Sequence, residues 1–125
     1  MKLERMTPNL MVTNIDQSIH YYKDTLGFEV VDRVESNFVI LSRDGVTLMM
    51  ESMEAMAQEY VELKHEVLKA SIALYFRIDD VEKLAATLKT KGYSVPDIYE
   101  TFYGTVETYL VDPDGYILTL SGEKR

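Results

Sequence analysis

The chain carries the same pattern twice, and this duplication limits what it can fold into more than any other feature. Residues 14–28 and 79–93 are stretches of equal length that each begin with Asn or Asp and end in Gly followed by an aromatic residue. Asn and Asp cap helices by accepting free backbone N–H groups, and Gly adopts the left-handed conformation that ends them. Each stretch is also preceded by a short apolar run. The pattern predicts a strand followed by a helix, built twice.

A second match follows the first in the same order. Asp44-Gly45 and Asp114-Gly115 each stand between two apolar runs, which is a strong short-range signal for a β-hairpin. Each half therefore reads as strand, helix, strand, strand, hairpin turn and strand. We expect strands near residues 8–13, 28–34, 37–42, 46–51, 71–78, 93–98, 105–111 and 116–121, and helices near residues 15–26 and 80–91.

Residues 52–69 join the two halves and show a different period. Apolar side chains recur there every three or four residues, which predicts an amphipathic helix. Its stripe consists of Met53, Met56, Tyr60, Leu63 and Val67, and most of its glutamates lie off that stripe. We expect this helix to pack on the domain or on a second subunit. The predicted organisation is a single domain, 1–125, with modules at 7–51 and 70–122.

Composition excludes several classes of function. The chain has 13 Lys and Arg against 21 Asp and Glu, a net charge of −8, so a nucleic acid or an anionic membrane is not an expected partner. The absence of cysteine excludes disulfides and thiolate chemistry. No window approaches the roughly 20 apolar residues of a membrane-spanning helix, and the N-terminus has no signal-peptide pattern. We expect a soluble cytoplasmic protein.

Two motifs resemble a known family. Residues 12–22, followed by Leu26-Gly27-Phe28, resemble the opening of the vicinal oxygen chelate superfamily, which includes glyoxalase I, bleomycin-resistance proteins and extradiol dioxygenases. Tyr103-Gly104, then Glu107 and residues 112–116, resemble its closing motif. The resemblance implies an α+β fold in which two βαβββ modules form an eight-stranded curved sheet around a cleft. It also implies a homodimer.

Metal-dependent members of that superfamily carry four His or Glu ligands on the first and last strands of the modules. In this sequence those positions fall on Thr7, Met49, Ala73 and Thr119. None of these is a usual ligand of a divalent metal ion. We therefore expect no metal and no cofactor, and we assign no catalytic residue. The alternative is an enzyme of the same superfamily whose metal site has moved to Glu51 and Glu107.

Strand alternation identifies the side chains that face the expected cleft. Leu10 and Val12 form the apolar, core-facing side of the first strand. The predicted ligand-binding residues are Asn9, Met11, Thr13, Met49, Glu51, Tyr75, Arg77, Tyr103, Glu107, Tyr109 and Thr119. Tyr103 stands where metal-free, drug-binding relatives carry a stacking aromatic. Taken singly, each of these residues is better explained by packing, and only as a set do they favour ligand binding equally.

These observations leave three functions open. The first is a metal-free protein that binds a small organic molecule, neutral or cationic, and sequesters a drug or metabolite. The second is a lyase, isomerase or dioxygenase with the displaced metal site. The third is a structural or regulatory dimer that uses residues 52–69 as its interface.

Overall fold

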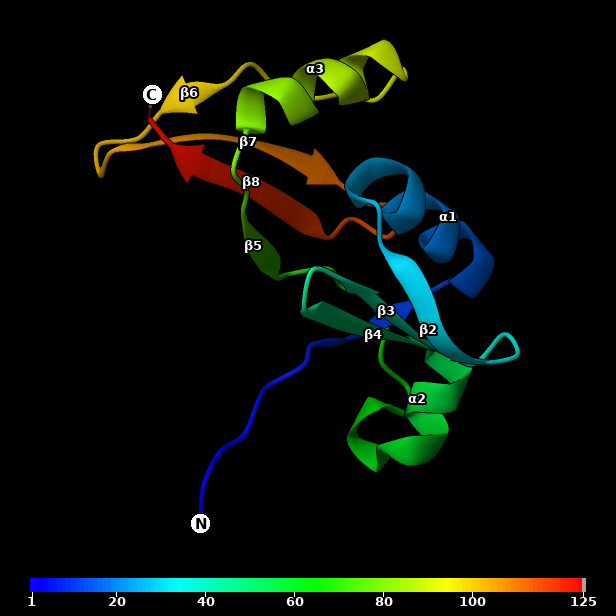
Figure 1. Cartoon of the computed structure of the whole chain (residues 1–125). Coiled ribbons are helices and arrows are strands. Elements are labelled where there is room, and N and C mark those ends of the chain that lie inside the picture. The colour runs from blue at the N-terminus through cyan, green and yellow to red at the C-terminus, as the bar shows by residue number, and fades with distance from the viewer. Residues whose placement is uncertain (125) are drawn as a thin grey trace. The chain divides into compact units, whose positions relative to one another are not determined.

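The duplicated pattern appears as two units, Met1–Lys69 and Ala70–Arg125, in a computed structural model that describes residues 1–124 (Figure 1). Each unit contains one four-stranded mixed sheet with the order strand, helix, strand, strand, strand. This confirms the predicted α+β class and the two βαβββ modules. The boundary between the units lies where the second module was expected to begin.

The first unit has its strands in the order β1-β4-β3-β2. β1 runs parallel to β4, and the other neighbours are antiparallel. A short α-helix and a turn of 3-10 helix follow the sheet. The elements are β1 (Asn9–Val12), α1 (Ile15–Leu26), β2 (Glu29–Val34), β3 (Phe38–Arg43), β4 (Val46–Ser52), α2 (Met53–Glu59) and η1 (Val61–Leu63).

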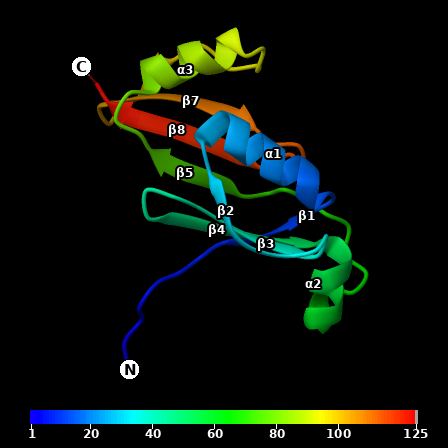
Figure 2. The same ribbon diagram turned by 45° about the vertical axis from the view of Figure 1, so that its right-hand side comes forward.

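The second unit repeats this topology in the order β5-β8-β7-β6, with β5 parallel to β8. Its helix lies over β7 and β8 in both ribbon views (Figure 2). The elements are β5 (Ala73–Arg77), α3 (Val81–Thr90), β6 (Tyr99–Glu100), β7 (Thr105–Val111) and β8 (Ile117–Glu123).

The helix ends follow the predicted capping chemistry. The Asn14 side chain accepts a hydrogen bond from the Gln17 backbone N–H at 2.9 Å, and Gly27 closes α1 with φ of 71°. Asp80 caps α3 in the same way. A left-handed φ at a helix C-terminus is accessible to Gly at little cost. Among the helices of residues 1–124, none is long and apolar enough to cross a membrane.

One face of each sheet supplies the core of its unit. Leu10 and Val12 are buried, as alternation predicts, and α1 packs against β3 and β4. In the second unit α3 packs against β7 and β8 so closely that a Cβ on Gly122 would lie 2.9 Å from Val81 Cγ2. The opposite face of each sheet carries its polar and aromatic side chains, and the candidate sites lie there.

Two predicted elements are wrong in extent. The single helix over 52–69 is replaced by α2, which ends at Glu59, and by η1, with Tyr60 extended between them. α2 has no basic residue in its last turn, so the C-terminal end of its dipole meets the carboxylate of Glu59. No strand forms over the expected range 93–98, where Pro96 has no N–H for a sheet ladder, and the two-residue β6 begins just after it, at Tyr99.

Candidate functional site

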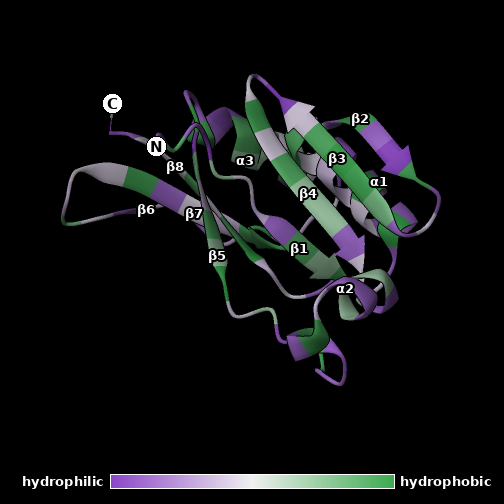
Figure 3. Ribbon diagram, turned by 90° about the horizontal axis from the view of Figure 1, so that it is seen from below, coloured by the Kyte–Doolittle hydropathy of each residue, from purple (hydrophilic) through white to green (hydrophobic). Residues whose placement is uncertain are grey.

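A buried carboxylate lies on the sheet of the first unit. Asn9 lies opposite Met49 and Met11 opposite Glu51 where β1 and β4 run in parallel. Asn9 Nδ2 donates a 2.7 Å hydrogen bond to Glu51 Oε1, and Glu51 is only 4% exposed. The hydrophobic run of β4 becomes hydrophilic at this end (Figure 3). The sheet therefore ends in a carboxylate that is hidden from water.

The short helix α2 brings a second acid to the same place. Ser52 caps α2 by accepting a hydrogen bond from the Ala55 N–H at 3.1 Å, and α2 packs against β1 and β4. Its last residue, Glu59, carries a carboxyl group in hydrogen-bond contact with that of Glu51. Tyr60, the next residue, directs its hydroxyl to Glu59. This arrangement depends on α2 ending at Glu59, which the sequence did not predict.

The contacts of Glu51 and Tyr60 set their protonation. Burial raises the pKa of Glu51, the hydrogen bond from Asn9 opposes that rise, and the neighbouring Glu59 raises the pKa further. The hydrogen bond to Glu59 and the negative charge of that residue raise the pKa of Tyr60. Two facing carboxyl groups do not both ionise freely, so the neighbouring Glu59 favours the protonated form of Glu51.

These groups line a pocket of about 430 Å³. Its wall is mixed, with apolar and aromatic side chains beside amides and the two carboxyl groups. No Lys, Arg or His is among the lining residues. The lining consists of Asn9, Val34, Asn37, Phe38, Met49, Glu51, Ala55, Gln58, Glu59 and Tyr60.

The second unit holds its own buried carboxylate, in a different setting. Glu107 on β7 is 3% exposed and accepts hydrogen bonds from four hydroxyl groups. Glu107 Oε2 accepts from Tyr75 at 2.7 Å, from Ser121 at 2.8 Å and from Thr105 at 3.0 Å. Tyr103 reaches both carboxylate oxygens at 3.1 Å. Residues from β5, β7, β8 and the β6–β7 loop thus meet at one acid.

This network holds Glu107 as an anion. Burial by itself raises the pKa of Glu107, but the hydrogen bonds from the surrounding hydroxyls, with Tyr75 and Ser121 the strongest, outweigh it and lower the pKa below the ordinary range. Two effects raise the pKa of Tyr103. The larger is burial of its hydroxyl, and the next is its hydrogen bond to Glu107. The tyrosines act as neutral donors to a fixed negative charge.

Comparison with known proteins agrees with these two modules. A family model described as the Glyoxalase/Bleomycin resistance protein/Dioxygenase superfamily matches residues 3–120. The chain belongs to this superfamily. No curated protein sequence matches the chain significantly.

Solved structures with the same fold include both binding proteins and enzymes. A bleomycin resistance determinant encoded on the transposon Tn5 is 23% identical, with a TM-score of 0.74 over 98% of this chain and 100% of that one. A bleomycin-binding protein complexed with bleomycin is also 23% identical, with a TM-score of 0.72 over the same shares of the two chains. A lactoylglutathione lyase from Agrobacterium tumefaciens is 17% identical, with a TM-score of 0.78 over 95% of this chain and 92% of that one.

The residues of this superfamily member do not fit the four-ligand metal centre that its fold family implies. Met49 lies opposite Asn9, and Thr119 lies opposite Tyr75, so the expected strand positions carry a thioether and a hydroxyl. The remaining positions carry Thr7 and Ala73. Within residues 1–124, no group of three or more His, Asp or Glu side chains is arranged to hold a metal ion. We derive no metal-dependent step for this chain.

The structure divides the predicted ligand-binding residues between the two units. Asn9, Met49 and Glu51 line the pocket of the first unit. Met11 shares their face, and Thr13 lies one residue beyond the end of β1. The binding role of all these residues remains a prediction.

In the second unit, Tyr75, Tyr103 and Glu107 meet in the hydroxyl network. Tyr109 and Thr119 lie opposite each other on the neighbouring strands β7 and β8. Arg77, the last residue of β5, forms a 3.8 Å ion pair with Glu123.

Several site residues were not identified from the sequence. Phe38, Glu59 and Tyr60 line the first pocket, and Thr105 and Ser121 complete the hydroxyl network. Phe38 and Ser121 lie directly opposite Glu51 and Glu107 on neighbouring strands. Strand register contained a signal for Phe38, which follows by counting from the two-residue turn at Asp44-Gly45, but not for Ser121, whose pairing depends on a wider loop. Glu59 and Tyr60 had none, because their position depends on where α2 ends.

Proposed function

We propose that this protein binds a small organic molecule, neutral or cationic, without a metal ion, and that it acts by sequestering that molecule. The observation that carries the proposal is the pocket of about 430 Å³ in the first unit, with the buried Glu51 in its wall. Small-molecule sites are typically concave and apolar with a few placed polar groups, in volumes of about 300–1,000 Å³. The pocket has this character.

The residues around Glu51 can hold such a ligand in a defined orientation. Phe38, Val34 and Met49 supply apolar surface, and the amide of Gln58 supplies both a donor and an acceptor. An aromatic wall such as Phe38 favours a flat or cationic ligand by stacking or by cation–π attraction, each about 1 kcal/mol. The bleomycin-binding protein of the same fold provides a precedent for ligand capture without implying the same ligand.

The metal-free part of the proposal rests on residue chemistry. Thr, Met and Ala at the four family positions offer neither imidazole nor carboxylate to a divalent ion. The displaced alternative needs Glu51 and Glu107, and Glu107 Oε2 already accepts four hydrogen bonds. A sequestering protein needs only a pocket.

Ligand-induced thermal shifts test the binding function. A panel of aromatic, cationic and peptide-like compounds is screened for a rise in Tm, and hits are followed by isothermal titration calorimetry. We expect Phe38→Ala to weaken a hit by about tenfold through lost stacking and burial. Phe102→Ala is the matched control, since Phe102 is fully exposed in the other unit. A flat panel would contradict the proposal, and loss of binding in the control alone would move the ligand to the second unit.

Elemental analysis tests the metal-free part separately. Protein purified without chelators is expected to contain no stoichiometric nickel, zinc, iron or manganese. A stoichiometric metal that is lost in Glu51→Gln or Glu107→Gln would establish the displaced site and favour an enzyme. The homodimer implied by the family is a further proposal, and light scattering at several concentrations measures the mass directly.

A further inference from the structure

The pocket of the first unit combines two facing carboxyl groups with a complete lack of basic lining residues. We propose that this pocket selects a protonated amine, and that the ammonium group replaces a proton held between Glu51 and Glu59. The inference rests on the proposed binding function, for which it names the ligand class and the ion that binding releases.

The rest of the pocket lining gives the carboxyl pair no positive partner. β1, β2 and β3 contribute Asn9, Val34 and Phe38 to the lining, none of which carries a charge. The only titratable groups in the lining are Glu51 on β4, Glu59 on α2 and the adjoining Tyr60. With no Lys, Arg or His among the lining residues, a proton is what reduces the repulsion between the two carboxyl groups.

The two acids differ in burial. Glu51 is 4% exposed and is fixed by the hydrogen bond from Asn9, whereas Glu59 is exposed at the helix end. A buried carboxylate without a positive partner is costly. An ammonium group entering the pocket supplies that partner, and its N–H groups donate to the carboxylate oxygens as the O–H of the shared proton did.

An R–NH₃⁺ ligand enters, the O–H bond of the carboxyl pair breaks, and the proton passes to water. The positive charge of the ammonium group replaces that of the released proton, and no other bond changes. Affinity for the amine therefore falls as the pH is lowered, because protons compete for the same carboxyl pair.

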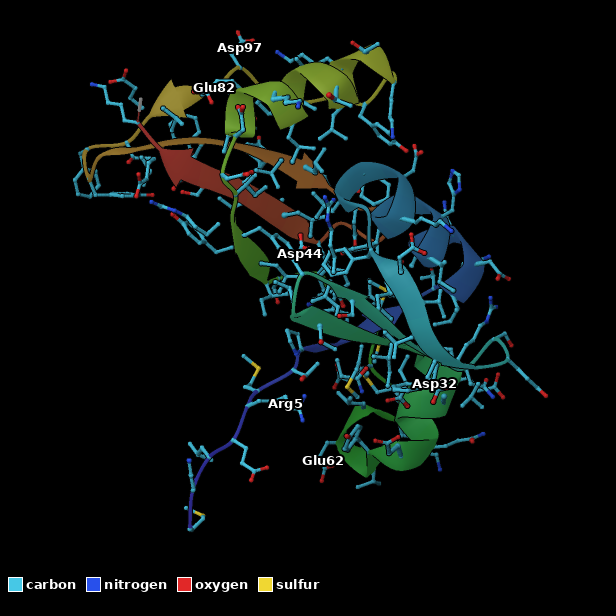
Figure 4. The ribbon with its side chains drawn as sticks, viewed as in Figure 1. Arg5, Asp32, Asp44, Glu62, Glu82 and Asp97 are labelled. Carbon is cyan, nitrogen blue, oxygen red and sulfur yellow. The ribbon has the colours of Figure 1, made fainter. Side chains whose placement is uncertain are left out.

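The surrounding charge favours the same class of ligand. Residues 51–66 contain five Glu and one Lys, and the whole first unit has 12 acidic against 7 basic residues. Asp32 and Glu62 extend from this unit as exposed side chains (Figure 4). A negative field of this kind attracts cations and repels anions during encounter.

A matched set of three probes tests the inference. Phenethylammonium, 2-phenylethanol and 3-phenylpropionate share one ring and differ in the charge of the end group. Binding is followed at millimolar concentration by NMR and by calorimetry in buffers of different ionisation enthalpy, which counts released protons. We expect phenethylammonium to bind at least about tenfold more tightly than 2-phenylethanol at neutral pH, with proton release, and 3-phenylpropionate not to bind.

Three variants assign the effect to the carboxyl pair. Glu51→Gln should remove the preference for the ammonium over the alcohol. Glu59→Gln, at an exposed position that tolerates change, should still bind the amine but release fewer protons, because burial of Glu51 remains. Glu54→Gln, on the exposed side of α2, is the control and should leave both properties unchanged.

The outcomes separate this inference from the binding function. Equal binding of the alcohol and the ammonium, or ammonium binding with no proton release in the wild type, would overturn the inference and leave the pocket as a neutral site. Failure of phenethylammonium to bind while a neutral compound of the thermal-shift panel does bind would also overturn it. A flat panel together with three silent probes would overturn the proposed function itself.

Discussion

Each unit buries one glutamate on the same kind of sheet face, yet the pKa values of the two acids are shifted in opposite directions. The pKa of Glu51 is raised and that of Glu107 is lowered. Strand register explains why. Equivalent strand positions pair the residues of the two units. Asn9 corresponds to Tyr75, Glu51 to Ser121 and Phe38 to Glu107.

The buried acid therefore lies on β4 in the first unit but on β7, which corresponds to β3, in the second. In the first unit Glu51 on β4 has Asn9 as its donor and a second acid beside it. In the second unit Glu107 on β7 faces Ser121, and Tyr75, in the place of Asn9, also donates to it. Donor number, more than burial, decides the sign of the pKa change, because both side chains are more than nine-tenths buried.

The largest effect is expected at the better-satisfied acid. Glu107→Ala removes the acceptor of four hydroxyl groups, two of which, on Thr105 and Ser121, belong to buried residues. We expect the free energy of unfolding to fall by about 2–3 kcal/mol, since buried unsatisfied donors each cost about 1 kcal/mol or more. Chemical denaturation measures the change. A loss below about 0.5 kcal/mol would show that these hydrogen bonds contribute nothing net to stability.

The pH dependence of stability distinguishes the charge of Glu107 from its shape. A folded pKa below the ordinary value of 4.5 means that the charge stabilises the fold above that pH, and that this contribution disappears as the pH falls through the folded pKa. Glu107→Gln keeps the shape and lowers stability at pH 7 by about 1–2 kcal/mol. Its unfolding curve should also lose less stability on acidification than the wild type. Parallel acid profiles of the two proteins would contradict the assignment.

Much of this architecture follows from local signals. The capping pairs at Asn14 and Gly27 predict α1 to the residue, and Asp44-Gly45, both with positive φ, form the two-residue turn between β3 and β4. That turn sets Arg43 opposite Val46 and hence, by counting outward, Phe38 opposite Glu51. The first site could therefore have been extended from sequence alone.

The second module shows why the same count fails there. A two-residue turn at Asp114-Gly115 would pair residue 113 with residue 116, but the structure pairs Val111 with Ile117. The Asp112 side chain accepts hydrogen bonds from the backbone N–H groups of Asp114 and Tyr116 and enlarges the loop. This shifts the register by one residue and places Ser121 opposite Glu107. The hydroxyl network therefore depends on the hydrogen bonds of the Asp112 side chain inside this loop, which secondary-structure propensities do not predict.

A smaller effect is expected at the donors. Tyr75→Phe removes the 2.7 Å hydrogen bond to Glu107 while leaving the ring. We expect a loss of about 1 kcal/mol in unfolding free energy and an upward shift of the pKa of Glu107. Tyr109→Phe is the matched control, because Tyr109 lies on the same sheet face and no hydrogen bond of its hydroxyl occurs within residues 1–124. NMR titration of the Glu107 carboxyl carbon reads the pKa. Equal effects of the two substitutions would show that ring packing alone matters.

The smallest effect is expected at Glu51, and it has the opposite sign. A folded pKa above 4.5 means that stability is fully present below that pH and is lost as the pH rises through the folded pKa. Glu51→Gln mimics the protonated acid, and its amide still accepts from Asn9 and donates to Glu59. At pH 7 we expect a gain of about 0.5–1 kcal/mol in unfolding free energy, since the variant has no buried carboxyl group that must either ionise or hold a proton at that pH. Glu54→Gln should change little. A destabilising acid of this kind serves a purpose other than stability. If Glu51→Gln gains stability and loses amine selectivity, Glu51 is the functional acid of the two and Glu107 is the structural one.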